Sequence, residues 1–421
     1  MKFVLACYGS RGDVEPCVAL GGELLRRGHQ VCIAVPPDLV AFAAATGPEA
    51  VAFGPEVQPI LDAHRTFWTY FFGNFWKIPD LIRLRREIAE PVIQRWDEIA
   101  TTLTSLADGA DMLITGLNFE QPAFNVAEYH DIPLATLHIF PHRANGQFLG
   151  FLPSSVGRSA MKMYEWLAWR VGKKLEDPQR RELRLPKAHR SLPRRISEHG
   201  CLEIQAYDEV CFPGLAAEWA KDNDKRRFVG ALTLGMAADA DDEVLSWVAA
   251  GTPPIFFGFG SIPVKSPADT IAMISAVCAQ LGERALVCAA GTDFSQAPHS
   301  DHVKVVGAVN YAEAFPACRA VVHHGGVGTT AASLRAGVPT LILSTDIDQT
   351  LWGARVKMLK VGTARRFSTT TRETLVADLR TILAPQYAAR AREVATRITK
   401  PAASVAAAAD LVEDFARRSP R

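Results

Sequence analysis

A strand, a glycine-rich turn and the start of a helix follow one another in residues 321–330, and this order restricts the fold more than any other part of the chain. The segment reads Val321-Val322-His323-His324-Gly325-Gly326-Val327-Gly328-Thr329-Thr330. A turn with few side chains lets a ligand approach the backbone closely. The first amides of a helix have no internal partner, and the helix dipole favours negative charge there. The segment therefore predicts a phosphate cradle, to which His324 adds a donor.

A polar pair, Asp348-Gln349, lies just past the next apolar strand, which spans residues 340–343. A carboxylate and an amide that stand side by side can hold two sugar hydroxyls. A phosphate cradle followed by such a pair suits a nucleotide-linked sugar. The alternative is an ordinary helix cap ahead of the helical stretch 350–359.

Strands alternate with helices along much of the chain, which indicates parallel sheets covered on both faces. The expected strands span 3–7, 30–35, 111–115 and 132–139 in the first half, and 255–259, 285–289, 303–306, 320–323 and 340–343 in the second. The alternation fades from 140 to 215. A chain of 421 residues is too long for one ordinary core. We therefore expect an α/β fold with two doubly wound sheets facing each other across a cleft, where ligands bind at the carboxyl ends of the strands.

The expected domain boundaries follow from the same patterns. An N-terminal domain covers 1–215, a linker that includes a polar run covers 216–240, and a C-terminal domain covers 241–385. Helices in 386–421, the last of them rich in alanine, are expected to pack back across the domain junction.

Composition restricts the partners and the compartment. The formal net charge of +1 gives no reason to expect a nucleic-acid partner. None of the eight cysteines forms a CxxC pair, so we expect buried free thiols in a reducing cytoplasm rather than disulfides or zinc. No uncharged apolar stretch approaches the roughly 20 residues that a membrane span needs. These features predict a cytoplasmic protein.

Four motifs carry a resemblance that extends over nearly the whole chain. They are Gly9-Ser10-Arg11-Gly12-Asp13-Val14-Glu15-Pro16, Phe259-Gly260-Ser261, the histidine–glycine segment Val322 to Thr330, and Asp348-Gln349. With them the chain resembles the inverting nucleotide-sugar glycosyltransferases of GT-B fold. The similar branch includes the bacterial glycopeptide-antibiotic, sterol and mycobacterial glycolipid glycosyltransferases. The resemblance implies two Rossmann-like domains, with the acceptor held by the first and the donor by the second.

The resemblance also implies residue roles. Asp13 would be the general base that takes the proton of the acceptor hydroxyl; the alternative is a carboxylate that caps a helix. The donor diphosphate would be held by Ser261, His324, Gly326, Gly328 and Thr329, while His323 would be structural. Backbone groups at Val309 would bind the base, which leaves UDP and dTDP equally open. Asp348 and Gln349 would bind the sugar.

The same resemblance bears on metals. Asp346 and Asp348 have the spacing of a DxD metal motif, but the second aspartate belongs to the sugar-binding pair. We therefore expect Asp346 to be a solvated loop charge, and we expect neither a metal nor any cofactor beyond the UDP- or dTDP-sugar co-substrate. Fixed dipoles at the cradle would stabilise the leaving diphosphate.

Two further stretches have a structural and a functional interpretation. Residues 67–76 are unusually aromatic, and form either a packed helix or an apolar acceptor wall made of Phe67, Trp68, Phe71, Phe72 and Trp76. Residues 173–195 hold nine Lys/Arg against three acids. This basic stretch is either a solvated face or a patch that contacts anionic lipid at the inner membrane face. The oligomeric state is left open.

Three other functions compete with a glycosyltransferase. Gly326, Gly328 and Ala331 fit a dinucleotide fingerprint with Asp346 twenty residues beyond Gly326, which suggests an NAD-dependent oxidoreductase, although a lone match is weak. A nucleotide-sugar 2-epimerase shares the GT-B fold and needs no hydrophobic acceptor pocket. A non-catalytic sugar-nucleotide or lipid-binding protein is the third alternative.

Overall fold

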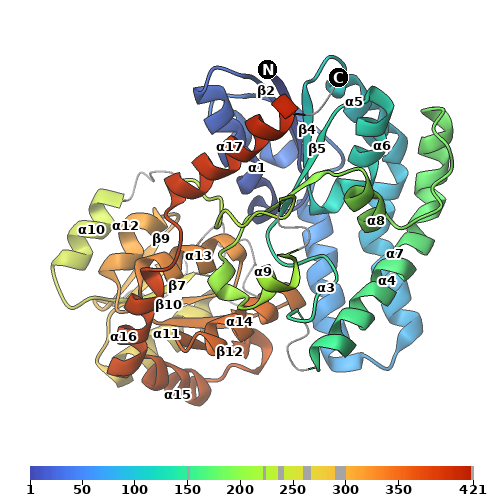
Figure 1. Ribbon diagram of the computed structural model, residues 1–421. Coiled ribbons are helices and arrows are strands. Elements are labelled where there is room, and N and C mark those ends of the chain that lie inside the picture. Colours follow the sequence, from blue (N-terminus) through green and yellow to red (C-terminus); the bar gives the residue numbers. More distant parts are fainter. Residues whose placement is uncertain (149–151, 221–223, 236–240, 259–266, 290–299, 419–421) are drawn as a thin grey trace. The chain divides into compact units, whose positions relative to one another are not determined.

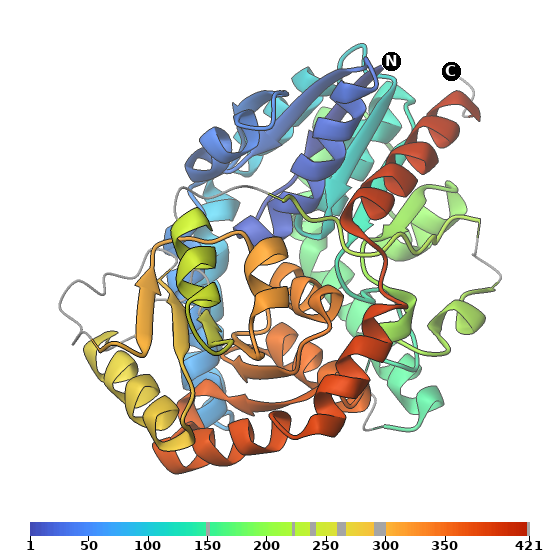
Figure 2. The ribbon, with the colours of Figure 1, turned by 90° about the vertical axis from the view of Figure 1, so that its left-hand side faces the viewer.

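The chain divides into two compact units, which are described separately. Unit 1 comprises Met1–Leu234 and Thr399–Arg421, and unit 2 comprises Gly235–Ile398. The structure is a computed structural model that describes residues 1–148, 152–220, 224–235, 241–258, 267–289 and 300–418. Figures 1 and 2 show that each unit is a sheet flanked by helices.

Unit 1 contains a six-stranded parallel sheet in the order β3-β2-β1-β4-β5-β6. Its strands are β1 (Lys2–Ala6), β2 (Gln30–Val35), β3 (Glu49–Ala52), β4 (Met112–Gly116), β5 (Leu134–His138) and β6 (Leu202–Gln205). Its helices are α1 (Arg11–Arg26), α2 (Val40–Ala44), α3 (Gln58–Asn74), α4 (Ile78–Gln94), α5 (Trp96–Ala107), α6 (Glu120–His130), α7 (Ser154–Glu182), α8 (Leu192–Glu198), α9 (Leu215–Glu218) and α17 (Pro401–Arg418). The order reverses between β1 and β4, and such a reversal is where ligands bind in open α/β sheets.

Unit 2 repeats this plan with the order β12-β11-β10-β7-β8-β9. Its strands are β7 (Ile255–Gly258), β8 (Ala285–Cys288), β9 (Val303–Val306), β10 (Ala320–His323), β11 (Thr340–Ser344) and β12 (Gly362–Arg366). Its helices are α10 (Asp241–Ala249), α11 (Pro267–Leu281), α12 (Tyr311–Ala314), α13 (Val327–Ala336), α14 (Ile347–Met358), α15 (Arg372–Ile382) and α16 (Pro385–Ala395). Here the order reverses between β7 and β10. The expected α/β fold of two doubly wound parallel sheets is confirmed.

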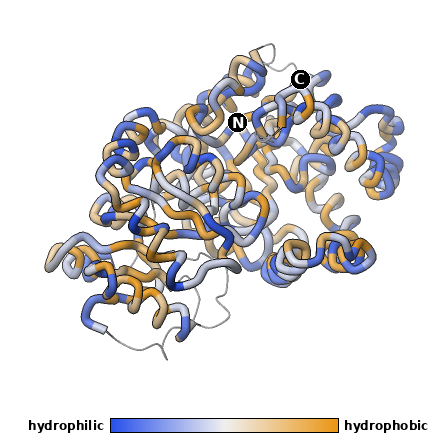
Figure 3. Tube along the Cα trace, turned by 90° about the horizontal axis from the view of Figure 1, so that it is seen from below, coloured by the Kyte–Doolittle hydropathy of each residue, from blue (hydrophilic) through white to orange (hydrophobic). Residues whose placement is uncertain are grey.

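Side chains that alternate along the buried strands form a core on each face of each sheet. On β1, Phe3 and Leu5 pack with α1 and α17, whereas Val4 and Ala6 pack with α5 and α6. In unit 2, Phe257 faces α11 and α15, and Phe256 faces α10. Hydrophobic and hydrophilic residues alternate along the helices, as Figure 3 shows, and helices such as α1, α5 and α11 turn their buried residues to the sheets.

The last two helices, α16 and α17, belong to different units. The Arg390 side chain of α16 donates from Nε to the carbonyl of Leu359 at 3.0 Å, within unit 2. Helix α17 belongs to unit 1, where Ala408, Ala409 and Val412 are fully buried in the core beside α1. The sequence placed residues 386–421 in a single group, because a helical pattern does not show which core an amphipathic helix completes.

Three local expectations require correction. A disulfide joins Cys7 and Cys17, so the expectation that every cysteine is a free thiol is wrong. The apolar positions of both residues favoured buried thiols, but β1 and α1 bring the two sulfurs together. The sequence predicts a loop from Tyr8 to Asp13 after the first strand, but helix α1 begins at Arg11, so Asp13 lies in its first turn. A strand, β6, also lies within the stretch where the alternation seemed to fade.

We predict that unit 1 depends on α17 for stability. Truncating the fully buried Val412 to alanine removes two methyl groups from the core and should lower the free energy of unfolding of unit 1 by about 2 kcal/mol. Ala403 is exposed on the same helix, so Ala403→Ser is the matched control and should change little. Urea denaturation of both variants measures the effect, and equal midpoints would contradict the packing of α17 described above.

Candidate functional site

A glycine turn connects β10 to α13 in unit 2. Gly325 has φ +100°, and a Cβ there would lie 2.8 Å from Ile342 Cγ2 and 3.1 Å from the carbonyl oxygen of Gln349. Both the backbone conformation and the space therefore require glycine. Gly326 is the N-cap of α13 and has no side chain to cap the helix. The first amides of the ten-residue α13, including those of Gly328 and Thr329, are thus left for an external acceptor.

The two histidines before this turn have different environments. His323 is fully buried, and its Nδ1 accepts a hydrogen bond from the amide of Gly325 at 3.0 Å, so it shapes the turn. His324 is half-buried, and a Cβ on Gly326 would lie 2.6 Å from its Nε2. The Nε2 atom of His324 is therefore the ring nitrogen next to the helix start.

Burial makes His324 a neutral donor. It lowers the pKa of His324 to about 4, and a hydrogen bond to the backbone of Gly258 opposes that shift. At neutral pH the ring is uncharged, and Nδ1 has no partner among the described residues, so the bond to Gly258 uses the proton on Nε2. Nε2 would donate to a phosphate oxygen at the start of α13 by exchanging that bond. Gly258 ends β7, which pairs with β10, so the contact lies where the strand order reverses. Ser261 comes three residues later and lies outside the described residues.

The predicted sugar-binding pair sits at the start of α14, and the two residues differ in accessibility. Gln349 is buried: its Nε2 donates to Asp346 Oδ2 at 2.6 Å, and its Oε1 accepts from the amide of Thr345 at 2.8 Å. Asp348 is exposed in the first turn of the helix. Asp348 is thus presented to the surface, whereas the Gln349 amide is engaged within the loop.

Asp346 is the helix cap at this position. Its Oδ1 accepts from the amide of Gln349 at 2.9 Å, and its Oδ2 holds the Gln349 side chain. The expectation of a solvated loop charge is therefore wrong. The sequence reasoning weighed Asp348 and Gln349 as the cap, although Asp three residues ahead of an amide is the usual N-cap spacing. Asp346 positions the pair.

Val309, the predicted base-binding position, is half-buried just ahead of α12. Its neighbour Asn310 caps that helix by accepting from the amide of Ala312 at 3.0 Å, and the amide of Asn310 donates to Asp241 at 2.7 Å. Val309 packs at the edge of the core that contains Phe315. These bonds fix the backbone around Val309, which is the part that would contact a base.

In unit 1, Asp13 lies at the start of α1, beyond the end of β1. Asp13 Oδ2 accepts from the amide and the hydroxyl of the N-cap residue Ser10, at 2.8 and 2.7 Å. Burial raises the pKa of Asp13, and the two hydrogen bonds from Ser10 oppose that rise. Both bonds use Oδ2, so Oδ1 is the oxygen available to take a proton. The capping and catalytic interpretations are therefore compatible.

Asn118 is a neighbour of Asp13 that the sequence reasoning missed. It follows β4, the strand beside β1, and its Nδ2 donates to the carbonyl of Tyr8 at 2.7 Å. A Cβ on Gly9 would lie 2.5 Å from Asp13 Oδ2 and 2.9 Å from Asn118 Nδ2. Both side chains thus converge on Gly9, where the strand order of unit 1 reverses. The signal for Asn118 was its place at the end of an expected strand.

The predicted acceptor aromatics are placed in three different environments by α3 and the turn after it. Phe67 is buried against Leu81 and Leu84 of α4. Trp68, Phe71 and Phe72 are half-buried and in mutual ring contact, with centroids 5.3 to 5.8 Å apart. Trp76 is 62% exposed in the turn between the two helices. The three half-buried rings form the continuous apolar surface.

Four of the nine cations in the predicted basic stretch 173–195 form ion pairs with acids of unit 1. Arg180 is buried and paired with Glu128 at 2.8 Å, and Arg195 is buried against Glu176. Arg190 and Arg194 both contact Glu198. The buried Arg180 and Arg195 therefore contribute to the packing of α7 and α8, whereas Lys174, Arg181, Arg184 and Lys187 are exposed.

Two family models match different parts of this chain. Residues 3–113 match the model of the glycosyltransferase family 28 N-terminal domain, and residues 258–416 match that of the erythromycin biosynthesis protein CIII-like C-terminal domain. The uncharacterised glycosyltransferase Rv1524 of Mycobacterium tuberculosis is 57% identical over 421 residues, which is 100% of both chains. The oxidoreductase and epimerase alternatives gain no support from these matches.

Solved structures show the same fold. The glycosyltransferase of kitacinnamycin aligns with a TM-score of 0.68 and 17% identity, over 98% of both chains. The glycosyltransferase VinC, solved in complex with dTDP, aligns with a TM-score of 0.63 and 17% identity, over 99% of this chain and 100% of VinC. At this identity the likeness concerns the fold.

We predict that His324 makes the stability of unit 2 depend on pH. Its folded pKa of about 4 lies below the ordinary 6.5, so the unfolded state binds more protons between these values. The contribution of the neutral His324 ring to the free energy of unfolding is complete above pH 6.5 and is lost as the pH falls toward 4. Its upper size is about 3 kcal/mol. In the variant His324→Gln, the free energy of unfolding should therefore depend less on pH between 4 and 6.5. His302→Gln is the control. Denaturation of unit 2 at several pH values measures this dependence. Parallel curves of unfolding free energy against pH for wild type and His324→Gln would refute the prediction.

Proposed function

This chain belongs to the GT-B glycosyltransferases, and from that premise we propose that it moves a hexose or deoxyhexose from a UDP- or dTDP-sugar to a hydroxyl of a hydrophobic acceptor. The acceptor would be a glycolipid, a sterol or a natural-product aglycone. The observation that carries the proposal is the uncapped start of α13, with the neutral His324 beside it. That arrangement suits a diphosphate leaving group.

The donor half of the proposal rests on unit 2. Amides of Gly326, Gly328 and Thr329, with His324, would bind the diphosphate, and Ser261 would add a hydroxyl. Val309 would contact a pyrimidine through its backbone. VinC, a protein of the same fold, was solved in complex with dTDP, which supports a nucleotide-linked donor for this chain. In the sugar pair, the exposed Asp348 would contact hydroxyls directly, and Gln349 would do so after exchanging its bond to Asp346.

The chemical step would be an inverting displacement. Asp13 takes the proton of the acceptor hydroxyl, the oxygen forms a bond to the anomeric carbon, and the bond from that carbon to the diphosphate breaks. Its raised pKa makes Asp13 a stronger base than an exposed carboxylate. Negative charge that develops on the diphosphate is stabilised by the fixed amides of α13. Exclusion of water would limit hydrolysis of the donor.

We also propose that transfer needs no metal ion. The carboxylate of Asp346, the first aspartate of the DxD spacing, is engaged by both the amide and the side chain of Gln349. This carboxylate caps α14 and holds the side chain of Gln349. Activity should persist in EDTA, and its loss there would reopen the assignment.

The acceptor would contact the aromatic surface of α3. Trp68, Phe71 and Phe72 are half-buried, so they combine a fixed position with an accessible apolar face. Phe67 would support them from the core, and Trp76 would act at the outer end of the helix. Aromatic faces suit a lipid, a sterol or an aglycone ring.

Peripheral contact with the inner membrane face, from a cytoplasmic location, is a further part of the proposal. No described helix is long and apolar enough to cross a bilayer. Helix α7 instead has a face of exposed apolar side chains: Val156, Met163, Tyr164, Trp166, Leu167 and Val171. Arg170 and Lys174 lie on the same exposed side, and the Arg170 guanidinium stacks over Trp166 at 5.5 Å. Aromatic rings beside cations are typical of helices that lie on anionic lipid.

We predict that Asp13→Asn lowers turnover by about 100-fold or more while the donor still binds, because the amide cannot accept the proton. Transfer assays with radiolabelled sugar measure turnover, and calorimetry measures donor binding. Ser10→Ala, which removes one hydrogen bond to the same carboxylate, is the control for a damaged helix start. Unchanged turnover in Asp13→Asn would remove Asp13 as the base.

A donor and acceptor screen tests the function as a whole. UDP- and dTDP-linked sugars should be transferred to members of a panel of lipid, sterol and polyketide acceptors. Protection against thermal unfolding by UDP or dTDP, and not by NAD, should accompany transfer. Protection by NAD alone would instead favour the oxidoreductase.

We predict that the double variant Trp166→Ser, Leu167→Ser lowers co-sedimentation with vesicles that contain phosphatidylglycerol. Each nearby cation contributes about 1 kcal/mol to such binding, so neutral vesicles should bind the wild type weakly. Tyr129→Ser is the control, because Tyr129 is 49% exposed on α6. Equal sedimentation with neutral and anionic vesicles would rule out the membrane contact.

A further inference from the structure

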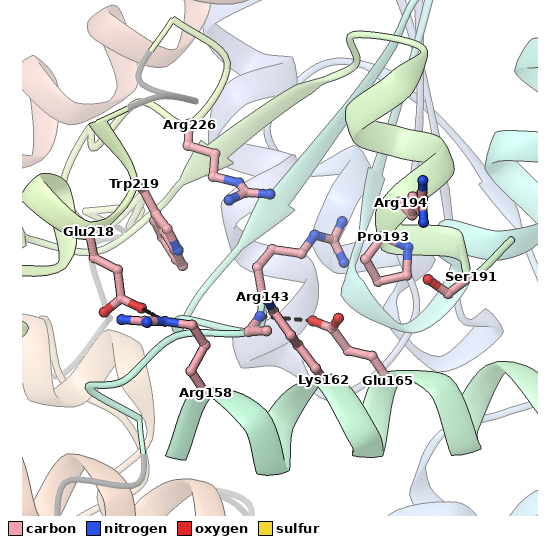
Figure 4. A pocket seen from close by; sticks show the side chains of 11 residues that line it. Arg143, Arg158, Lys162, Glu165, Ser191, Pro193, Arg194, Glu218, Trp219 and Arg226 are labelled. Atoms are coloured by element: carbon pink, nitrogen blue, oxygen red, sulfur yellow. Dashed lines mark hydrogen bonds and ion pairs between the residues drawn. The ribbon is translucent and has the colours of Figure 1, made fainter. Parts of the chain in front are cut away.

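A polar cavity of ≈590 Å³ lies within unit 1, apart from all the site residues discussed above. Its lining contains five cations and two carboxylates: Arg143, Ala144, Arg158, Lys162, Glu165, Ser191, Pro193, Arg194, Glu218, Trp219 and Arg226. In Figure 4, α7 runs along one side, and residues of the α8 and α9 regions face it. A cavity of this size accommodates a small molecule rather than a single ion.

The charges at the floor of the cavity are fixed from behind. Arg143 is 2% exposed and bonds Glu120 at 2.8 and 3.0 Å, and it also contacts Glu203. Arg226 donates to Glu203 at 2.9 Å and stacks over the ring of Trp219 at 5.2 Å. Glu120 and Glu203 do not line the cavity but contact these guanidinium groups directly from behind, so the charges of Arg143 and Arg226 are paired and the two side chains are held rigidly at the cavity wall.

The two carboxylates that do line the cavity are already engaged. Glu218 accepts from Arg158 at 2.6 Å and from the amide of Gly146 at 2.9 Å. Glu165 accepts from the amide of Ala144 at 2.8 Å, and burial raises its pKa. Their charge is therefore partly satisfied by donors of the protein itself.

Two donors at the cavity lack an acceptor among the described residues. Trp219 is 4% exposed, and its buried Nε1 has no hydrogen-bond partner there. In the view of Figure 4, this nitrogen lies on the ring edge nearer to Arg143. Lys162 is exposed on α7 and has no ion pair within the described part of the chain. A buried donor without an acceptor is costly, so an oxygen-rich ligand at this position would relieve a real deficit.

We propose that this cavity binds the phosphate group of a small molecule or of a lipid headgroup. The indole N–H of Trp219 and the ammonium of Lys162 would each donate to a phosphate oxygen. Arg158 and Arg194, whose side chains are 41% and 64% exposed, are paired with Glu218 and Glu198, and their remaining N–H groups would donate at the mouth of the cavity. Phosphate suits these donors because its oxygens accept from several directions at once, and the rest of the volume holds the remainder of the molecule.

The indole N–H of Trp219 reports binding at this cavity alone, so the test does not depend on glycosyl transfer. In ¹⁵N-labelled protein, Trp219→Phe assigns the Trp219 signal among those of the eight tryptophans. Titration with glycerol 3-phosphate, and separately with monomeric dihexanoyl phosphatidylglycerol, should shift it. A shift with both ligands assigns the phosphate itself, and a shift with one identifies the soluble or the lipid source.

Matched variants separate a bound phosphate from a general effect of ions. Lys162→Gln should weaken binding about five-fold, as expected for one partly exposed charged donor. Lys400→Gln, which removes an exposed cation of unit 1 outside both the cavity lining and the exposed face of α7, should leave the affinity unchanged. Unchanged signals of the other tryptophans show that the variants are folded. The proposal is overturned if the Trp219 signal does not move with either ligand, or moves equally with sodium chloride or in Lys162→Gln.

Discussion

The unpaired amides at the start of α13 are the constraint on which unit 2 depends. A helix that begins directly after a buried strand cannot satisfy these donors itself, and Gly326 provides no side chain to do so. The sequence keeps the position free of side chains by placing glycines at the turn, and Gly325 adopts a backbone conformation that other residues rarely adopt. Strand pairing of β10 with β7 then sets His324 against Gly258. The arrangement leaves the amides and the partial positive charge of the helix start without a capping side chain.

Much of the fold could be predicted because buried parallel strands are continuous apolar runs. β1 and β10 were recognised in this way, with ends shifted by about one residue at most. The missed strands lie at the sheet edges: β3, β6 and β12. β12 carries Thr363, Arg365 and Arg366, because an edge strand is partly solvated and needs no apolar run. β6 is buried, but Glu203 and Gln205 interrupt its pattern, since both bond other buried polar groups.

Site residues could be predicted where a motif determines the backbone conformation. They were harder to predict where a polar side chain has several possible hydrogen-bond partners. In the histidine–glycine segment, the glycines alone predict the turn between β10 and α13. Around Asp346, in contrast, three neighbouring polar residues compete for the cap of α14, and the resemblance directed attention to Asp348 and Gln349 although the N-cap spacing favoured Asp346. Asn118 required knowledge that β4 lies beside β1, and the pairing of Arg180 and Arg195 with acids required knowledge of how α7 packs. Long-range contacts decide these cases, and a single sequence does not show them.

The shared oxygen of Asp13 ties the chemistry of the first unit to the folding of its first helix. The carboxylate oxygen that receives both bonds from Ser10 belongs to the group proposed to accept a proton. Once protonated, that group becomes a weaker acceptor, so each turnover would briefly loosen the first turn of α1. Deprotonation would tighten it again before the next acceptor arrives. The stability of the first turn of α1 would thus depend on whether Asp13 is protonated.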